Sequence, residues 1–158
     1  PEAPEAIRKI NTSDYLAVMV TNQSAVARNL INTEELTQIH NKLKADLQAY
    51  NAHLDAIYYC PHHPNFSGTE ANKDLIKDCH CRKPKPGMLT DASEEMDIDL
   101  RHSYMIGDAE RDILAGKEAG CITIGVRTGK NIESFNIQPD YIFENILEAV
   151  DFILGRND

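Results

Sequence analysis

The 158-residue sequence lacks any apolar run that approaches the length of a membrane span, and it lacks internal repeats and low-complexity tracts. The first absence excludes a transmembrane helix, which needs about 20 consecutive apolar residues. We also find no secretory signal peptide, so we expect a cytoplasmic protein. A chain of this length can bury a core of its own, and we expect one domain over residues 1–158.

Basic residues are scarce relative to acidic ones. The chain has 16 lysines and arginines against 25 aspartates and glutamates, which gives a formal net charge of −9. Because such a surface repels nucleic acids and anionic membranes, we expect neither as a partner. A local cationic site for a small phosphate-bearing molecule is still compatible with this balance. The sequence does not indicate an oligomeric state.

Cysteine is also scarce, with four residues, and three of them lie near histidines in one irregular window. Thiolate and imidazole are zinc ligands, so we predict a structural zinc that clips a loop over residues 60–85, in a reducing compartment. The spacing is tighter than in most zinc motifs, and buried free thiols are the alternative. The fourth cysteine, Cys121, is expected to be a small core residue. The window contains Cys60-Pro61-His62-His63-Pro64 and Cys79-His80-Cys81-Arg82-Lys83-Pro84.

Predicted strands alternate with predicted helices along the chain. This alternation is typical of an α/β fold with a doubly wound parallel sheet. A capping box at Thr33 predicts the start of the second helix, and the apolar stripe that follows is expected in the core. That stripe comprises Leu36, Ile39, Leu43, Leu47 and Tyr50. Predicted strands cover residues 15–20, 56–59, 103–106, 121–126 and 141–143, and the other helices cover 4–12, 86–96, 109–119 and 144–154.

Polar side chains follow each of the first three predicted strands. In open α/β sheets, ligands bind at the carboxyl ends of the strands. Hydroxyl, lysine and arginine donors suit a phosphate, and a carboxylate suits Mg²⁺. The convergence therefore predicts phosphoryl chemistry. The residues are Thr21, Asn22 and Gln23 after the first strand, Arg82 and Lys83 after the second, and Asp108 after the third.

Each of these groups also has a structural interpretation. Thr21 and Asn22 are common turn residues, and Asp108 is well placed to cap the following helix. Asp112, one helical turn later, is expected to be a cap or a partner of another side chain and not a metal ligand. His63 and His80 lie one residue from predicted zinc ligands, and we expect them to face solvent.

Several segments, met in a fixed order, carry a family resemblance. They are Val20-Thr21-Asn22-Gln23-Ser24, Tyr58-Tyr59-Cys60-Pro61-His62-His63-Pro64, Cys79-His80-Cys81-Arg82-Lys83-Pro84-Lys85-Pro86-Gly87-Met88-Leu89, Met105-Ile106-Gly107-Asp108 and Val126-Arg127-Thr128-Gly129-Lys130. Together they resemble the haloacid-dehalogenase superfamily over about residues 1–150. Within it, the chain is similar to the zinc-loop branch of heptose-1,7-bisphosphate 7-phosphatases and histidinol-phosphate phosphatases.

The resemblance implies a Mg²⁺-dependent phosphatase that hydrolyses a sugar phosphate through a phosphoaspartate, with a structural Zn²⁺. The longer zinc loop, the double histidine and the Arg-Thr-Gly-Lys segment favour heptose bisphosphate over histidinol phosphate. The roles of Arg127 and Lys130 stay open. The implied site residues are Thr21, Asn22, Gln23, Arg82 and Lys83 for phosphate and substrate, Asp108 for Mg²⁺, and Cys60, His62, Cys79 and Cys81 for Zn²⁺.

One departure separates the chain from this family. The family pattern includes an N-terminal central strand that ends in Asp-x-Asp-Gly-Thr, and its two aspartates are the nucleophile and the acid/base. The only Asp-x-Asp here, at Asp97 and Asp99, follows a predicted helix and lacks the Gly-Thr. We therefore expect no catalytic aspartate in these residues, about thirty further residues upstream in the natural protein, and no phosphatase activity from the chain alone.

Two alternatives come from other functional classes. The first is a catalytically silent, zinc-clipped binding domain, which the missing nucleophile motif supports. The second is a receiver-type signalling domain, which is less favoured because such domains have no zinc loop.

Overall fold

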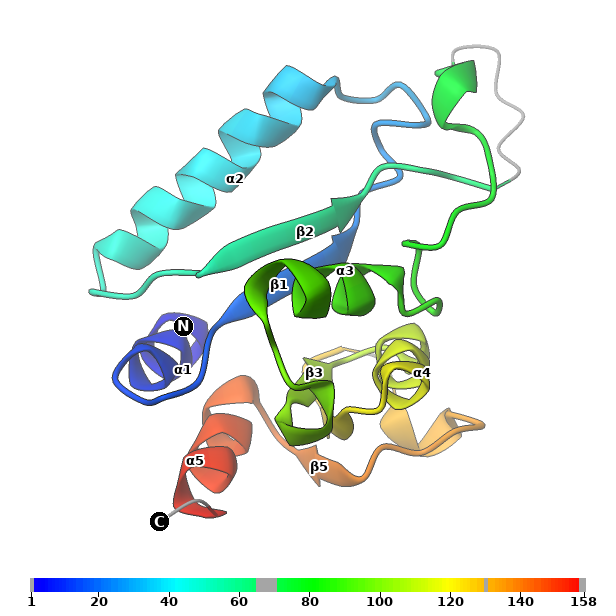
Figure 1. The fold of residues 1–158 in the computed structure, drawn as a ribbon. Coiled ribbons are helices and arrows are strands. Elements are labelled where there is room, and N and C mark those ends of the chain that lie inside the picture. Colours follow the sequence, from blue (N-terminus) through cyan, green and yellow to red (C-terminus); the bar gives the residue numbers. More distant parts are fainter. Residues whose placement is uncertain (1, 65–70, 130, 157–158) are drawn as a thin grey trace.

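A computed structural model of the protein describes residues 2–64, 71–129 and 131–156 (Figure 1). Helices and strands alternate as the sequence predicts. None of the described helices is both long enough and apolar enough to cross a membrane. The helices are α1 (Glu2–Asn11), α2 (Thr33–Gln48), α3 (Gly87–Met96), α4 (Glu110–Ala119) and α5 (Ile146–Arg156), and the strands are β1 (Val18–Asn22), β2 (Ala56–Cys60), β3 (Tyr104–Gly107), β4 (Ile122–Val126) and β5 (Tyr141–Phe143).

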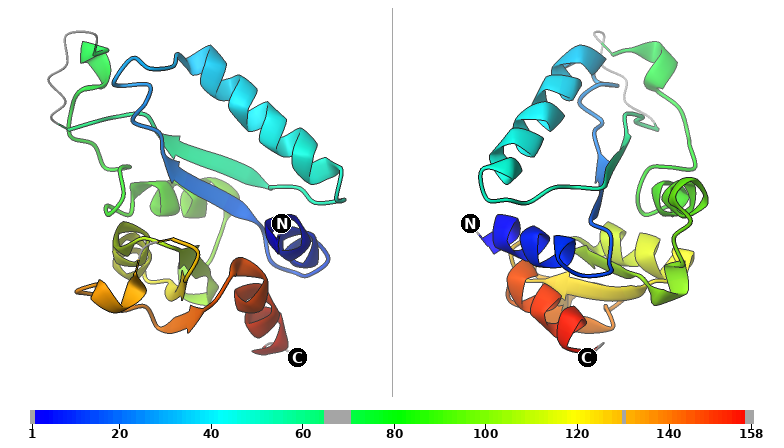
Figure 2. Two further views of the ribbon diagram at one scale, coloured as in Figure 1. Left: turned by 180° about the vertical axis from the view of Figure 1, so that it is seen from behind. Right: turned by 60° about the vertical axis from the view of Figure 1, so that its left-hand side comes forward.

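The strands form two parallel sheets. One pairs β1 with β2, and the other has the order β3-β4-β5. Figure 2 shows α1, α2 and α5 on one side of the strands and α3 and α4 on the other. This three-layer arrangement confirms the predicted α/β class with parallel strands and helices on both faces.

A gap separates the two sheets. Among the described strands, none pairs with the second edge of β1 or with the second edge of β3. A cavity of about 970 Å³ lies between them, and its walls include Val18 and Val20 of β1 and Tyr104 and Ile106 of β3. These unpaired edges expose backbone N–H and C=O groups. Among the described strands, the arrangement is therefore open between β1 and β3.

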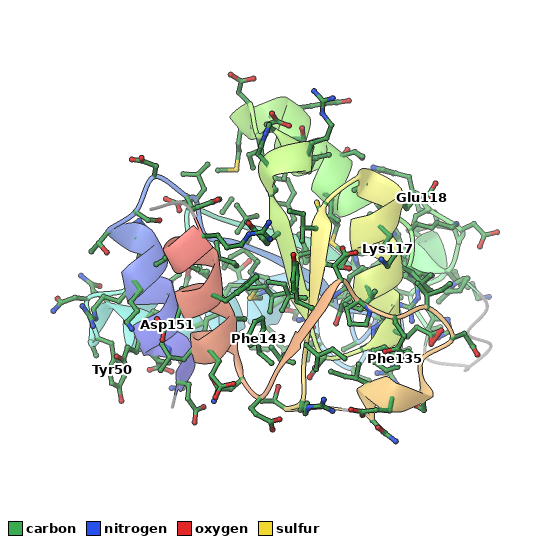
Figure 3. All side chains as sticks on the ribbon, turned by 90° about the horizontal axis from the view of Figure 1, so that it is seen from below. Tyr50, Lys117, Glu118, Phe135, Phe143 and Asp151 are labelled. Carbon is green, nitrogen blue, oxygen red and sulfur yellow. The ribbon has the colours of Figure 1, made fainter. Side chains whose placement is uncertain are left out.

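Helices hold the two halves of the molecule together. α1, which precedes β1, packs on α5, which follows β5, and Lys9 pairs with Asp151 at 2.8 Å. Figure 3 shows Asp151 where α5 faces α1. On the other face, α3 contacts both β2 and α4. The ring centroids of Phe143 in β5 and Phe152 in α5 lie 5.0 Å apart.

The start of α2 differs from the prediction. The capping residue is Asn32 and not Thr33: the Asn32 side chain accepts from the Glu35 N–H at 2.7 Å. In return, the Glu35 carboxylate accepts from the Asn32 N–H at 3.2 Å. Asn32 has extended backbone angles, whereas Thr33 is already helical, so only Asn32 can serve as the cap.

The apolar stripe of α2 is only partly buried. Leu36 and Leu47 are in the core, but Ile39 and Tyr50 are 51% and 61% exposed. Tyr50, together with Leu47, lines the cavity between the sheets, so its exposure reflects the open gap beside the helix. The prediction that the whole stripe is core packing was therefore wrong for Ile39 and Tyr50.

The first strand begins later than predicted. The apolar run at residues 15–20 continues into β1, but pairing with β2 starts only at Val18. Just before it, the Ala17 N–H donates to the Asp55 carboxylate at 2.7 Å, and the Asp55 N–H donates to the Ala17 carbonyl at 2.7 Å. These two hydrogen bonds with the residue before β2 fix the register of the two strands. As a result, β1 continues past Val20 and ends with Thr21 and Asn22.

Candidate functional site

Asn22 connects the end of β1 to the segment that carries the predicted phosphate-binding lysine. Its side-chain amide donates to the Lys83 carbonyl at 3.3 Å and accepts from the Lys83 N–H at 3.0 Å. The Lys83 ammonium donates to the Val20 carbonyl at 3.2 Å. The backbone and the side chain of Lys83 are thus both held against the carboxyl end of β1.

Asp112 is the carboxylate partner of Lys83. The Lys83 Nζ lies 2.6 Å from Asp112 Oδ1, and the two side chains are only 11% and 8% exposed. The second oxygen, Oδ2, accepts from the Ala109 N–H at 3.1 Å. A Cβ at Gly107 would lie 2.3 Å from the Asp112 Cβ, so a glycine is required where β3 ends. Asp112 is therefore both a helix cap and a side-chain partner, as expected.

Asp108 differs from Asp112 in the contacts of its carboxylate. Among the described residues, no cation pairs with Asp108 and no donor bonds to its oxygens. It is exposed, and it lines the same cavity as Lys83 and Asp112. A hard carboxylate oxygen that is not engaged elsewhere suits Mg²⁺. Of the two carboxylates, Asp108 is the one available to a metal.

The loop after β4 approaches Asp108 closely. A Cβ at Gly129 would lie 2.5 Å from the Asp108 Oδ2, so only a glycine lets the loop pass at this distance. In the same loop, Arg127 is engaged by two carboxylates, Glu133 and Glu144, the second at 3.1 Å. Lys130, the last member of the Arg-Thr-Gly-Lys segment, lies outside the described residues.

Thr21 and Gln23 extend the polar end of β1. The Gln23 side-chain amide donates to the Thr21 hydroxyl at 3.3 Å, and the Gln23 N–H donates to the Cys60 carbonyl at 2.7 Å. The end of β1 is therefore tied to the end of β2, where the predicted zinc loop begins. The structure brings Thr21, Asn22 and Lys83 to one edge, and their roles toward a ligand stay predictions.

The four predicted zinc ligands converge, and their ligand atoms all lie within 4.8 Å of one another. Cys60 Sγ lies 3.5 Å from both His62 Nδ1 and Cys79 Sγ, and His62 Nδ1 lies 3.4 Å from Cys81 Sγ. Around a tetrahedral zinc with Zn–S bonds of about 2.3 Å, neighbouring sulfur atoms are about 3.8 Å apart. The 2.8 Å between Cys60 Sγ and Cys81 Sγ is shorter, and those two thiols must separate to receive a metal. The donor set and its spacing fit zinc.

The protonation of these groups also bears on metal binding. Burial raises the pKa of the Cys60 and Cys81 thiols. Burial acts in the same direction on Cys79, but hydrogen bonds from the Arg82 N–H and from neighbouring groups outweigh it and lower the pKa of Cys79. Burial, with Lys77 nearby, lowers the pKa of His62, which keeps its imidazole neutral and able to act as a ligand.

The cysteine cluster and the lysine segment form one unit. Arg82 Nη1 donates to the His62 carbonyl at 3.2 Å. Arg82, which directly follows Cys81, is therefore bound to the first part of the 60–85 loop. Gly87 lies against His80, where a Cβ would be 2.0 Å from the His80 carbonyl oxygen. His80 is exposed and pairs with Asp91 at 2.9 Å, while Cys121 is buried in the core, both as the sequence suggests.

Comparison with known proteins places these observations in a family. A family model described as HAD-hydrolase-like matches residues 80–149. The D-glycero-β-D-manno-heptose-1,7-bisphosphate 7-phosphatase of Pasteurella multocida is 41% identical over 153 residues, covering 96% of this chain and 80% of that protein. The D-glycero-D-manno-heptose-1,7-bisphosphate 7-phosphatase of Chlorobaculum tepidum is 33% identical, covering 98% and 80%.

Solved structures show the same relationship. The D,D-heptose 1,7-bisphosphate phosphatase of B. bronchiseptica, complexed with magnesium and phosphate, matches with a TM-score of 0.85 at 32% identity, covering 99% of this chain and 83% of that chain. A phosphatase of the same name from Burkholderia thailandensis has a TM-score of 0.72 at 23% identity, which shows a shared fold. Taken with the Cys/His cluster and the Lys83 segment, these matches show that the chain belongs to the heptose-1,7-bisphosphate 7-phosphatase family of HAD-like hydrolases.

Proposed function

We propose that the chain forms the phosphate- and metal-binding part of a Mg²⁺-dependent phosphatase that removes the 7-phosphate of heptose 1,7-bisphosphate. One observation carries the proposal: the buried ammonium of Lys83 and the carboxylate of Asp108, which no described residue pairs with, line the same cavity. The names of the Pasteurella and Chlorobaculum relatives support heptose bisphosphate as the substrate. The magnesium and phosphate in the B. bronchiseptica structure support the predicted ligands.

Lys83 and Thr21 are the groups that would bind the transferred phosphoryl group. The Lys83 ammonium neutralises the negative charge that spreads over the phosphoryl oxygens in the transition state, and Asp112 and Val20 fix its position beforehand. The Thr21 hydroxyl donates to a phosphoryl oxygen. Asp108 would hold Mg²⁺, which when bound supplies further positive charge at the same oxygens.

The nucleophile would come from a strand in the gap between β1 and β3. A carboxylate oxygen of that strand attacks phosphorus, the bond from phosphorus to the sugar oxygen breaks, and a second carboxyl group protonates the leaving oxygen. Water then attacks the phosphoaspartate, which releases inorganic phosphate and restores the carboxylate. None of the aspartates present in the 158 residues stands in an Asp-x-Asp-Gly-Thr strand, so we propose that the chain alone has no phosphatase activity.

Zinc would be structural in this scheme. Four protein ligands leave no open position for a water or a substrate oxygen. Its function would be to keep Arg82 and Lys83 in place, since both follow directly on Cys81 and one of them bonds to the loop at His62. We also propose that residues 1–158 act as one domain, supported by the contacts of α1 with α5 and of α3 with α4.

The test uses a strand-extended protein, meaning this chain preceded by a segment that supplies an Asp-x-Asp-Gly-Thr strand. We expect Mg²⁺-dependent release of phosphate from heptose 1,7-bisphosphate, with a much higher kcat/KM than for histidinol phosphate. A preference for histidinol phosphate would instead indicate a histidinol-phosphate phosphatase. Binding of either compound without turnover would favour the silent zinc-clipped domain.

A further inference from the structure

A second cationic pocket lies beside the predicted transfer site. Its volume is about 200 Å³, and its walls include Lys77, Arg82 and Lys85 together with Pro64 and one acid, Asp78. Lys83 lines both this pocket and the cavity between the sheets. The pocket is therefore adjacent to the place where the proposed phosphoryl transfer would occur.

Three of the cations that line this pocket lack an ion pair among the described residues. Within the described parts of the chain, Lys77, Arg82 and Lys85 form no ion pair with a carboxylate. The Lys85 ammonium donates to the Cys79 carbonyl at 2.8 Å, and Arg82 donates to the His62 carbonyl at 3.2 Å. Both acceptors are uncharged, so three of the four cations that line this small pocket have no carboxylate partner among the described residues, in a chain whose net charge is −9.

Two other cations near the site, Lys83 and Arg127, are already paired. Lys83 is bound to Asp112 at 2.6 Å, and Arg127 contacts both Glu133 and Glu144. An anion that reached Arg127 would have to compete with two carboxylates. In the pocket, Lys77, Arg82 and Lys85 form no ion pair with a described carboxylate, so an anion there would not have to displace one.

The backbone places Arg82 and Lys83 so that they serve two different anions. The two residues are consecutive, yet Lys83 reaches Val20 and Asp112, whereas Arg82 reaches the zinc loop at His62. A substrate with two phosphates can therefore present one to Lys83 and the other to the pocket. Arginine and lysine donors form charge-assisted hydrogen bonds with such a dianion.

We propose that Lys77, Lys85 and Arg82 bind the second, uncleaved phosphate of a sugar bisphosphate, and so determine the preference for bisphosphates over monophosphates. The inference rests on the proposed function, because it assumes a substrate that carries two phosphates. A monophosphate would engage Lys83 alone and would gain nothing from the pocket.

The experiment measures dissociation constants in a strand-extended protein whose supplied nucleophile is asparagine, so that no turnover occurs. The ligands are heptose 1,7-bisphosphate and heptose 7-phosphate, and the variant is Lys77→Ala with Lys85→Ala. We expect Kd for the bisphosphate to rise at least about tenfold, since two charge-assisted contacts are lost, and Kd for the monophosphate to change less than about twofold. Lys77→Arg with Lys85→Arg should retain most of the bisphosphate affinity.

Lys73→Ala is the matched control, because Lys73 is an exposed lysine of the same loop that does not line the pocket. An equal loss for both ligands, or no loss for either, would overturn the subsite while leaving the proposed function intact. If the unaltered protein binds neither compound, the proposed function fails and this inference fails with it.

Discussion

The Lys83 ammonium and the Asp112 carboxylate form a nearly buried ion pair at 2.6 Å. The pair joins the end of the predicted zinc loop to the first turn of α4. Because Lys83 also bonds to the end of β1, three elements meet at this one ammonium group. A single side chain therefore both holds the two halves of the molecule together and provides the positive charge of the proposed site.

The first prediction concerns this pair. In the strand-extended protein, Asp112→Ala should lower the free energy of unfolding by about 3 kcal/mol, since it leaves a buried ammonium without its partner. Lys83→Ala should lower kcat/KM by about a hundredfold or more, because it removes charge stabilisation in the transition state. Denaturant unfolding and steady-state kinetics measure the two effects.

A matched control is the exposed pair of Lys42 and Asp46 on α2, at 3.1 Å. Asp46→Ala should change the free energy of unfolding by no more than about 0.5 kcal/mol. Wild-type kinetics for Lys83→Ala on both heptose bisphosphate and histidinol phosphate would remove Lys83 from the phosphate site.

The second prediction concerns zinc. The protein should retain about one zinc per chain after dialysis. Binding at pH 7 should release at least about two protons, because burial raises the pKa of Cys60 and Cys81 and both thiols must lose a proton to bind the metal. Calorimetric titration in buffers of different ionisation enthalpy counts those protons.

Variants separate this zinc site from a set of buried thiols. Cys81→Ser should lower zinc content, whereas Cys121→Ser, at a buried cysteine outside the cluster, should leave it unchanged. Full zinc retention in both Cys60→Ser and Cys81→Ser would contradict the assignment.

The third prediction concerns magnesium. Asp108→Asn should sharply raise the Mg²⁺ concentration needed for half-maximal activity of the strand-extended protein and leave zinc content unchanged, because the two metals use different ligands. Asp97→Asn serves as the control, since Asp97, the exposed C-cap residue of α3, belongs to neither of the predicted metal-ligand sets. Unchanged Mg²⁺ dependence in Asp108→Asn would show that Asp108 is not the ligand.

The fourth prediction concerns pH and the connection before β5. The Asp140 carboxylate accepts from the Thr123 N–H at 2.8 Å and from the Thr123 hydroxyl at 3.0 Å. The Thr123 N–H is the main cause that lowers the pKa of Asp140, burial opposes it, and Lys117 adds to the lowering. A lowered folded-state pKa means that the ionised carboxylate stabilises the fold above the unfolded pKa, and that this contribution is lost as pH falls through the folded pKa.

Asp140→Asn should therefore reduce the free energy of unfolding at pH 7, and its difference from the unaltered protein should disappear in acid. Chemical denaturation across the acid range measures this. A difference that persists below the folded pKa would mean that the charge of Asp140 is not responsible.

The sequence predicted most of the sheet because its strands are buried on both faces. The second to fifth strands appear within about one residue of their apolar runs, since such runs mark strands covered by helices on both sides. The first strand was less well placed, because the exchange between Ala17 and Asp55 decides where pairing begins. That contact joins residues far apart in the chain, and local patterns do not contain it.

The candidate site, too, was predicted only where local sequence patterns determine it. Thiols and imidazole in one window predicted the Cys/His cluster, because few other arrangements use those residue types together. The pairing of Lys83 with Asp112 was not predicted, since it depends on how α4 packs beside the zinc loop. Gly129 was noted only as part of the Arg-Thr-Gly-Lys segment, and its close approach to Asp108 is visible only in the structure.

The last prediction concerns the gap between β1 and β3. The two unpaired edges run beside a cavity of about 970 Å³ that ends at Lys83 and Asp108. A strand of about five residues, rising about 3.3 Å per residue, matches the length of β1 and brings its last residue to that end. The 158-residue chain alone should therefore show no Mg²⁺-dependent phosphatase activity, and it should aggregate, because the exposed edges are free to pair with other chains.

A peptide that ends in Asp-x-Asp-Gly-Thr, or the strand-extended protein, should restore both monomeric behaviour and hydrolysis of heptose 1,7-bisphosphate. The control peptide has asparagine in place of the first aspartate. It should fill the gap and raise the melting temperature without restoring activity, which separates the strand's structural contribution from its chemical one. A monomeric preparation of the 158 residues that hydrolyses heptose bisphosphate unaided would overturn this prediction, and Asp108 would then be the first candidate for the nucleophile.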